Sequence, residues 1–272
     1  RLEGAVRQKN AVLTKLYGAE PIDLDELYEQ CLEHGRTLKP YITSVERRIS
    51  QALDSGARVV LEGAQGAMLD LDHGTYPYVT SSSVSIGGAC TGLGIPPGEI
   101  HGIIGVFKAY STRVGGGPMV TELDDEVGSE IREKAQEYGA TTGRARRVGW
   151  FDGLAARYSA KINGYTSIVL TRLDVLDGMP SVKLCIGYEA DGETVDYFPS
   201  QPGLLERCTP IYEELAGWTE PTAGATSLQQ LPPQAMAYVK HIEEIVGCTI
   251  DLVSTGPKRH ESITVRLIVP ER

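Results

Sequence analysis

The sequence lacks the cysteine spacing on which disulfide frameworks and zinc sites depend. Its five cysteines are odd in number, lie far apart in a chain of 272 residues and form no C-x-x-C pair. Small secreted scaffolds use even sets of cysteines, and structural zinc sites use closely spaced ones. The sequence therefore indicates neither a disulfide framework nor a zinc site.

Long apolar stretches are also missing. No run of residues approaches a membrane-spanning length, and no charged-then-apolar signal segment opens the chain. The 36 acidic residues outnumber the 26 basic ones and give a formal net charge of -10, so the surface should repel a phosphate backbone. We therefore expect a cytoplasmic protein that binds neither membranes nor nucleic acid.

Several familiar nucleotide-binding and catalytic motifs are absent as well. No G-x-x-x-x-G-K-[ST] occurs, so the usual backbone cradle and lysine for a triphosphate are missing. The G-x-G at Gly92–Gly94 lacks the strand-to-helix setting of a dinucleotide site, and no serine, histidine and aspartate set stands out as a hydrolase triad. Positive charge is instead concentrated in one short loop.

That loop is G-A-T-T-G-R-A-R-R at Gly139–Arg147. Guanidinium groups match carboxylate and phosphate oxygens two at a time, the threonine hydroxyls add donors, and the glycines let the backbone approach a ligand. The loop therefore suits a small anion. An isolated R-x-R-R fits a solvated basic turn equally well, with Glu133 and Glu137 as local partners.

The periodicity of apolar residues predicts a helical segment over residues 1–56, followed by an α/β core over 57–272. Four short apolar runs that end in turns are typical of parallel strands. They are Arg58–Leu61, Ile103–Phe107, Ser167–Thr171 and Thr249–Val253. Strands that are antiparallel or at an edge are expected at Lys183–Tyr188 and Ile263–Ile268, and helices at Arg1–Gly18, Asp23–Gly35 (N-cap Asp23), Thr43–Gly56, Asp125–Tyr138, Asp152–Ile162 and Pro233–Val246. The chain opens on Arg1 in a helix already under way, which suggests a fragment.

Polar side chains follow the first of these runs. Gln65 can offer a donor and an acceptor to a heterocycle or a phosphate, and the hydroxyls of Thr80–Ser83 add neutral donors. Together they suit a phosphorylated ligand. Between them, the D-x-D-H cluster of Asp70, Asp72 and His73 resembles a metal site, but a polar loop with solvated aspartates is the favoured interpretation because no further spaced ligand accompanies it.

A basic-x-Asp turn, Arg172-Leu173-Asp174, follows the run at Ser167–Thr171. A carboxylate there can accept hydrogen bonds from N1–H and the exocyclic amine of guanine, while the stem of Arg172 covers the base. The turn is similar to the guanine-reading turn of GTP-binding proteins, although a capped strand end explains it too. Ser254-Thr255-Gly256, also directly after a strand, could contact the guanine ring through backbone amides.

Six motifs in order resemble adenylosuccinate synthetase over nearly the whole chain. They are E-G-A-Q-G at Glu62–Gly66, D-H-G-T-Y-P-Y-V-T-S-S at Asp72–Ser82, K-A-Y-S-T-R-V-G-x-G-P at Lys108–Pro118, G-A-T-T-G-R-x-R-R-x-G-W at Gly139–Trp150, L-D-V-L-D-G at Leu173–Gly178 and S-T-G-P at Ser254–Pro257. The resemblance covers only the larger, C-terminal part of that enzyme. Its G-D-E-G-K-G-K phosphate loop, catalytic aspartate and a histidine in the next loop have no counterpart here.

The resemblance implies a fold related to the P-loop GTPases, truncated at the N-terminus, and a cytoplasmic homodimer that joins IMP to L-aspartate with GTP and Mg²⁺. It places IMP at Gln65, Thr80 and Arg144, aspartate at Thr141, Thr142, Gly143, Arg144, Ala145 and Arg146, and GTP at Arg146, Arg172, Leu173, Asp174, Ser254, Thr255 and Gly256. Catalytic groups and Mg²⁺ ligands are expected in the missing segment, and Arg147 receives no role. Arg172 stands where lysine is usual, but its stem can still cover the base.

Because the phosphate loop and the proton-transfer groups are missing, we expect no synthetase activity from this chain alone. The alternatives are a fragment that only binds guanine nucleotide or IMP, and a structural piece that contributes a dimer interface.

Overall fold

Two units make up the chain, Arg1–Val59 and Val60–Arg272. The computed structural model describes residues 1–139, 143–201 and 203–266. Within that described part, no helix is both long and apolar enough to cross a membrane.

The first unit is helical. Its helices are α1 (Leu2–Val12), continued by a π-helical turn (Leu13–Tyr17), α2 (Leu24–Leu38) and α3 (Val45–Asp54). Asp23 accepts the backbone N–H of Glu26 and is the N-cap of α2, as the sequence predicts. The π-helical turn ends at Gly18, whose φ of 60° is left-handed and costs little without a Cβ.

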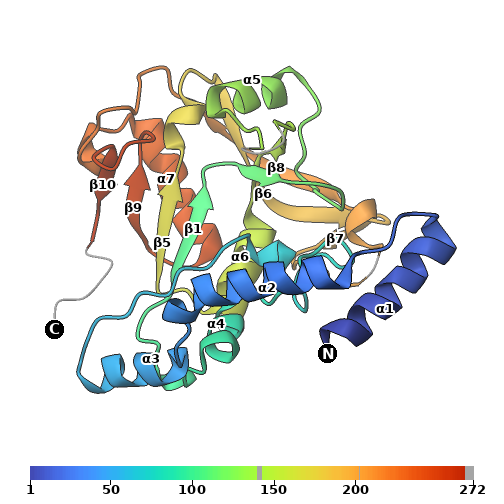
Figure 1. Ribbon diagram of the computed structural model, residues 1–272. Coiled ribbons are helices and arrows are strands. Elements are labelled where there is room, and N and C mark those ends of the chain that lie inside the picture. The colour runs from blue at the N-terminus through green and yellow to red at the C-terminus, as the bar shows by residue number, and fades with distance from the viewer. Residues whose placement is uncertain (140–142, 202, 267–272) are drawn as a thin grey trace. The chain divides into compact units, whose positions relative to one another are not determined.

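The central sheet of the second unit has the strand order β1-β5-β9-β10 (Figure 1). Strands β1 (Ile104–Lys108), β5 (Ser167–Thr171) and β9 (Ile250–Ser254) are parallel, and β10 (Ser262–Thr264) lies antiparallel at the edge. The predicted α/β class with a mostly parallel sheet is confirmed. Because the three strands run the same way, the segments that follow them emerge at one edge.

A second sheet is centred on β6 (Ser181–Ala190). It pairs in parallel with β4 (Phe151–Asp152) and antiparallel with β7 (Glu193–Val195) and β8 (Thr209–Ala216). A short ribbon joins β2 (Ser111–Arg113) to β3 (Arg147–Gly149). Of these strands the sequence predicted only the middle of β6, because the others are short or recognisable mainly by their partners.

The helices of the second unit are α4 (Ile86–Leu93), α5 (Glu126–Ala135), α6 (Gly153–Asn163) and α7 (Pro233–Val246). Asp125 and Asp152 cap α5 and α6 by accepting backbone N–H groups three residues later. The bounds of α7 match the predicted range, and Gly247 ends it in the left-handed conformation.

The predicted strand Ile263–Ile268 is shorter in the structure, because β10 ends at Thr264, and its last two residues lie outside the described part of the chain. Two further predictions about secondary structure are wrong. The apolar run Arg58–Leu61 forms no strand, because it pairs with no other strand of the described residues, and Val60 is 86% exposed. Helix α5 ends at Ala135 instead of Tyr138, because Gln136 adopts φ 52° and turns the chain. That early end releases Glu137 from the helix.

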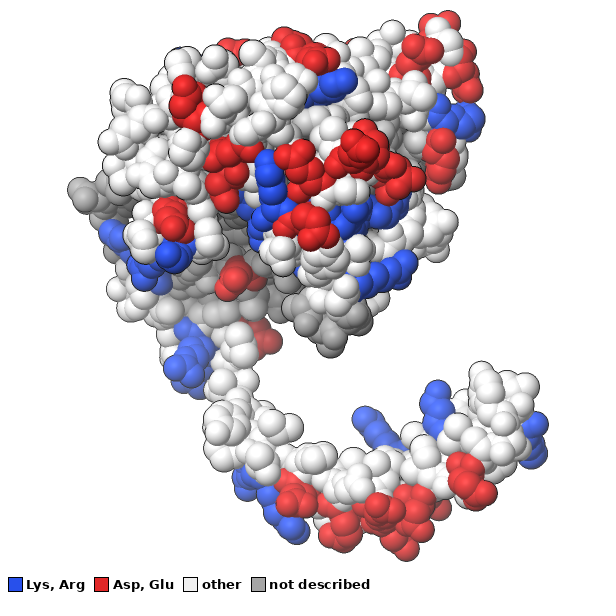
Figure 2. Space-filling model, turned by 90° about the horizontal axis from the view of Figure 1, so that it is seen from above, with Lys and Arg blue, Asp and Glu red and all other residues white. Residues whose placement is uncertain are grey.

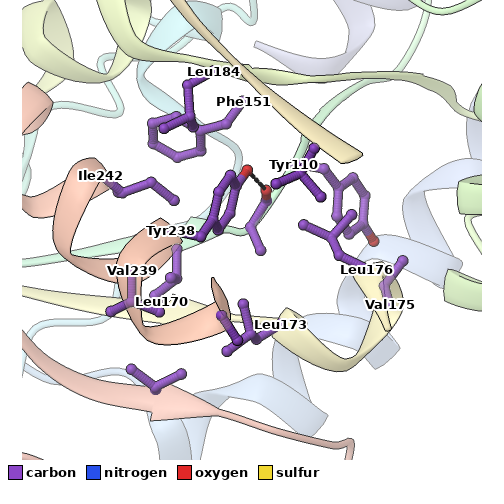
Figure 3. Close-up of a cluster of buried hydrophobic side chains, with 14 of the residues drawn as sticks. Tyr110, Phe151, Leu170, Leu173, Val175, Leu176, Leu184, Tyr238, Val239 and Ile242 are labelled. Atoms are coloured by element: carbon purple, nitrogen blue, oxygen red, sulfur yellow. Dashed lines mark hydrogen bonds between the residues drawn. The ribbon is translucent and has the colours of Figure 1, made fainter. Parts of the chain in front are cut away.

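The main core lies between the central sheet, α7 and the second sheet. Tyr238 of α7 is fully buried among apolar side chains that include Leu170, Leu173 and Ile242 (Figure 3). Its hydroxyl donates to the carbonyl of Ala109 at 2.7 Å, directly after β1. This bond joins α7 to the edge of the sheet at which the segments after the three parallel strands emerge.

Replacing Tyr238 by phenylalanine should lower the free energy of unfolding by about 1–3 kcal/mol, because the buried Ala109 carbonyl loses its donor. Urea denaturation of the wild-type chain and of Tyr238→Phe measures the change. Tyr197→Phe, at a tyrosine that is 53% exposed, is the matched control and should leave stability almost unchanged. Equal midpoints for Tyr238→Phe and wild type would contradict the assigned bond.

Candidate functional site

Polar segments follow all three parallel strands at the same edge of the central sheet. Lys108 ends β1, Arg172–Asp174 follows β5, and Ser254–Gly256 ends and follows β9. The register pairs Lys108 with Thr171, and β5 lies beside β9. Figure 2 looks onto the molecule from this side and shows Lys and Arg side chains interspersed with Asp and Glu. Carboxyl ends of parallel strands are where α/β proteins bind ligands.

Arg172 is held in an uncommon conformation. Its φ is 61°, in the left-handed region that residues with a Cβ adopt at a cost of roughly 1–3 kcal/mol. Its Nη1 donates to the carbonyl of Ala135 at 2.7 Å, which anchors the guanidinium to the end of α5. Gln65, a second residue of the expected ligand set, also has a left-handed φ, of 63°. Such backbone strain is concentrated at functional sites.

Asp174 offers a carboxylate with unused acceptors. It lies in the 3₁₀ turn Leu173–Leu176 and is half-buried, and no other described residue donates a hydrogen bond to its side chain. Burial raises its pKa, and Asp177 adds to the rise. Leu173 is fully buried in the core, so only its backbone is available to a ligand.

The turn after β9 is packed around Glu261. Its carbonyl accepts the N–H of Thr255 at 3.0 Å. A Cβ on Gly256 would lie 2.5 Å from the Glu261 carboxylate, so only glycine fits there without displacing it. Ser254 Oγ donates to the carbonyl of Gly256 at 2.8 Å. Thr255 Oγ1 is buried and has no partner among the described residues.

Glu137, which the sequence offered only as one partner of a solvated turn, is the centre of this edge. It is fully buried, and its Oε1 accepts Lys108 Nζ at 2.6 Å and the Tyr110 hydroxyl at 2.7 Å. Its Oε2 accepts Arg146 Nη1 at 2.6 Å, and Arg172 Nε lies 4.0 Å from Oε1. Burial raises the pKa of Glu137, but these hydrogen bonds lower it more, so the pKa stays below its ordinary value.

The arginine loop begins as a short hairpin. Arg146 N donates to the Glu137 carbonyl, and Gly139 N donates to that of Arg144, both at 2.9 Å. Gly143, Arg144 and Ala145 are exposed. Thr141 and Thr142, expected at the aspartate site, lie outside the described residues. The described end of the loop is therefore anchored, because Arg146 is paired with the buried Glu137.

Arg147, for which the sequence suggested no role, holds the β2–β3 ribbon in place. Its guanidinium is bonded to both carboxylate oxygens of Glu122, and its Nη1 donates to the Gly117 carbonyl at 2.7 Å. The hydrogen bond and charge of Glu122 raise the pKa of Arg147. These bonds leave Arg147 occupied within the chain.

Asp70 is buried, which corrects the expectation of a solvated aspartate. Its Oδ1 accepts the N–H groups of Asp72 and His73, both at 3.0 Å, and its Oδ2 accepts those of Val84 at 2.7 Å and Ser85 at 3.0 Å. Asp70 thus closes the loop 70–85. The described residues contain no cluster of three His, Cys, Asp or Glu side chains that could hold a metal ion.

Loop 70–85 carries Thr80 and is joined to β2 by Arg113. This arginine is 9% exposed, and its Nη2 donates to Thr75 Oγ1 at 2.9 Å and to the Tyr78 carbonyl at 3.1 Å. Its Nε donates to the Gly116 carbonyl at 2.8 Å. Burial lowers the pKa of Arg113, and the nearby Arg147 lowers it further. Among the described acids, none lies within ion-pair distance of it.

Comparison with known proteins gives the family. The family model of adenylosuccinate synthetase matches residues 1–263. The chain belongs to the adenylosuccinate synthetase family. It is 49% identical to the adenylosuccinate synthetase of Dehalococcoides mccartyi strain BAV1 over 263 residues, and 50% identical to that of Thermomicrobium roseum over 261. These alignments cover 97% and 96% of this chain, but only 62% and 61% of the relatives.

The structure agrees. It matches fully ligated adenylosuccinate synthetase from Plasmodium falciparum with a TM-score of 0.88 at 35% identity, covering 97% of this chain and 64% of that one. The chain spans about 62% of the length of the curated relatives that it matches.

The residues that the resemblance assigns to ligands fall into two groups in this member of the adenylosuccinate synthetase family. Arg146 and Arg172 meet around Glu137 at the sheet edge, and Asp174 lies two residues after Arg172, in the turn that follows β5 beside β9. Gln65 and Thr80 lie on separate loops, and no hydrogen bond joins them to this cluster within the described residues. Thr80 Oγ1 instead lies 3.3 Å from Ser82 Oγ. Sequence reasoning missed Glu137 because Lys108 and Tyr110 lie 29 and 27 residues away.

Proposed function

We propose that this chain supplies the substrate-binding part of an adenylosuccinate synthetase, a ligase that forms a C–N bond. The reaction joins IMP and L-aspartate, at the expense of GTP, to give adenylosuccinate, GDP and phosphate in AMP biosynthesis. In the implied chemistry, O6 of deprotonated IMP attacks the γ-phosphate, and the aspartate amine then displaces phosphate. Catalysis of this kind rests on positioning and on charge stabilisation.

The guanine site is proposed at two adjacent turns. The Asp174 carboxylate accepts the N1–H and the exocyclic amine of guanine, and the Arg172 stem covers the base. Leu173 and the Ser254–Gly256 turn contribute backbone groups. Asp174 supports this role because it is half-buried and no other described residue donates a hydrogen bond to its carboxylate. Adenine does not offer that pair of donors.

The remaining roles follow the resemblance. IMP is assigned to Gln65, Thr80 and Arg144, and aspartate to the loop residues Thr141, Thr142, Gly143, Arg144, Ala145 and Arg146, with Arg146 also facing GTP. Mg²⁺ supplies charge neutralisation at the phosphates when bound, and we expect its ligands and the catalytic groups in the part of the family length that this chain does not span. We also propose a cytoplasmic homodimer, because the family resemblance implies one.

One observation carries the proposal. The turns that carry Asp174 and Ser254 follow neighbouring parallel strands, and Arg146 from the arginine loop is held beside them through Glu137. A family member with this arrangement has base-reading and anion-binding groups at one edge. There are two alternatives without turnover. In one, the chain only binds nucleotide at this surface, and in the other it only contributes a dimer interface.

The 272-residue chain should form no adenylosuccinate when it is incubated with IMP, GTP, Mg²⁺ and aspartate, as followed by adenylosuccinate absorbance. A protein of full family length that carries this sequence, called the family-length protein below, should form it. Turnover by the chain alone would contradict the placement of the catalytic groups outside it. Lack of turnover by the family-length protein would contradict the proposed function itself.

Calorimetric titration of the chain with GDP and with ADP separates the two alternatives. Binding of GDP but not of ADP favours a nucleotide-binding part with the guanine site described above. Binding of neither nucleotide favours the structural alternative.

A further inference from the structure

Glu137 contacts cations from three segments of the chain, namely the end of β1, the arginine loop and the turn after β5. One fully buried carboxylate contacts Lys108, Arg146 and the Tyr110 hydroxyl, and Arg172 Nε lies 4.0 Å away. Three positive charges therefore surround one negative charge at the carboxyl edge of the sheet. The excess of cations leaves the cluster suited to an anion even though Glu137 is within it.

Arg146 is held firmly but retains an unused donor. Its Nη1 is bonded to Glu137, its backbone N–H to the Glu137 carbonyl, and its own carbonyl accepts Arg132 Nε at 2.9 Å. Its Nε is buried and has no hydrogen-bond partner among the described residues. The hydrogen bonds to Glu137 and Arg132 therefore fix both the guanidinium and the backbone of Arg146 at this edge of the sheet.

Lys108 and Arg172 are fixed in the same way. Lys108 Nζ donates to Thr112 Oγ1 at 3.0 Å as well as to Glu137, and its side chain is only 28% exposed. Burial lowers the pKa of Lys108, whereas its hydrogen bond to Glu137 raises it. Arg172 Nη1 donates to the carbonyl of Ala135 at 2.7 Å, and its Nε lies 4.0 Å from Glu137 Oε1. Lys108, Arg146 and Arg172 thus each lie against Glu137 and also make a hydrogen bond to another part of the chain.

We propose that Glu137 is a positioning residue that holds Arg146, and with it Lys108 and Arg172, as one set of cations facing the phosphates of GTP and the carboxylates of aspartate. It acts through these side chains and does not itself contact a ligand. Its single carboxylate makes the orientation of the arginine loop depend on the guanine turn. The inference rests on the proposed function and adds a residue to it.

A simpler role would be charge neutralisation, and the two roles predict opposite results. If Glu137 only offsets positive charge, Glu137→Gln leaves a more positive site, so the KM for GTP should fall. If it positions the cations, the same change weakens a charge-assisted hydrogen bond to Arg146, and the KM should rise. The direction of the change therefore decides between the roles.

In the family-length protein, Glu137→Gln should raise the KM for GTP and for aspartate about tenfold each, the effect of losing about 1.4 kcal/mol of binding. The KM for IMP, assigned to Gln65, Thr80 and Arg144, should change less than about twofold. Simple loss of folded protein would lower kcat and leave all three KM values unchanged. Glu133→Gln, at an exposed acid near the same loop that is bonded to the Tyr138 hydroxyl, is the matched control and should behave as wild type.

Glu137→Asp keeps the charge but shortens the side chain, so the carboxylate cannot reach Lys108 and Arg146 together. It should give the same pattern of KM changes with a smaller loss of stability, which keeps the test available if Glu137→Gln does not fold. The inference would be overturned by unchanged KM values for GTP and aspartate in this variant, or by a lower KM for GTP in Glu137→Gln. In either case, turnover by the wild-type protein would leave the proposed function intact. If wild type shows no turnover, calorimetry with GTP as the probe still compares the variants, and equal affinities would overturn the inference.

Discussion

Replacing Asp174 by alanine is expected to lower the affinity for GDP about a hundredfold and to leave the affinity for ADP almost unchanged. Asp174 is the half-buried carboxylate of the turn after β5, and no other described residue donates to it. Two hydrogen bonds from guanine to a charged acceptor are worth about 1.5–3 kcal/mol each, and part of this is regained from water in the variant. Adenine does not present the same pair of donors, so its affinity should not depend on Asp174.

Calorimetric titration of wild type and Asp174→Ala with each nucleotide provides the measurement. It is made on the 272-residue chain if the chain binds GDP, and otherwise on the family-length protein. Asp196→Ala removes an exposed aspartate from the loop after β7 and serves as the matched control. If Asp174→Ala lowered the affinity for GDP and the affinity for ADP to the same extent, Asp174 would support the turn without recognising the base.

The pH dependence of binding adds an independent check. Burial raises the pKa of Asp174 in the free chain, and Asp177 raises it further. Only the ionised carboxylate accepts both guanine donors, so the affinity for GDP should fall as the pH is lowered through this raised pKa. The affinity of Asp174→Ala for GDP should lack this dependence. The decline should begin at a higher pH than an ordinary aspartate would give.

Local signals predicted much of the fold. The caps at Asp23 and Asp152 and the bounds of α7 depend on residues within one helical turn, so the sequence contains the whole signal. Strands β5 and β9 were predicted because buried parallel strands are continuous apolar runs. Strand β8 alternates polar and apolar residues only weakly and is stabilised by pairing with β6, about thirty residues earlier, which no local pattern reveals.

The same limit applies to the site. Arg146, Arg172 and Asp174 were predicted as ligand-binding residues because each lies in a motif of neighbouring residues. Glu137 was considered only as a partner of a solvated turn, since its burial depends on the early end of α5 and on contacts with β1. The apolar run at Arg58–Leu61 shows the converse error, because composition alone suggested a strand that has no partner in the described residues.

Asp70 was misjudged for the same physical reason. Two aspartates and a histidine within four residues suggest either solvated side chains or a metal site. The carboxylate instead binds backbone N–H groups on both sides of a loop, two of them 14 and 15 residues away. A buried acceptor that satisfies four backbone donors is worth far more to the fold than a solvated side chain.

Changing Asp70 to asparagine should therefore destabilise the second unit by about 3 kcal/mol or more. The amide keeps the size of the side chain, but its NH₂ group must face either the N–H pair of Asp72 and His73 or that of Val84 and Ser85. Two buried donors then lose their acceptor, at about 1–3 kcal/mol each. Urea unfolding of the chain measures the loss, and Asp72→Asn, at an exposed neighbour, should change stability by less than about 0.5 kcal/mol.

Acid should reproduce the effect of Asp70→Asn in the wild-type chain. Burial raises the pKa of Asp70, but the four backbone N–H groups lower it more, to about 2. Because the folded pKa lies below the unfolded value of about 3.9, the ionised carboxylate stabilises the fold above that value. Its contribution is lost as the pH falls from about 4 through about 2, and the stability difference between wild type and Asp70→Asn should shrink over the same range. A difference that stayed constant between neutral pH and pH about 2 would show that the charge of Asp70 does not hold the loop that carries Thr80.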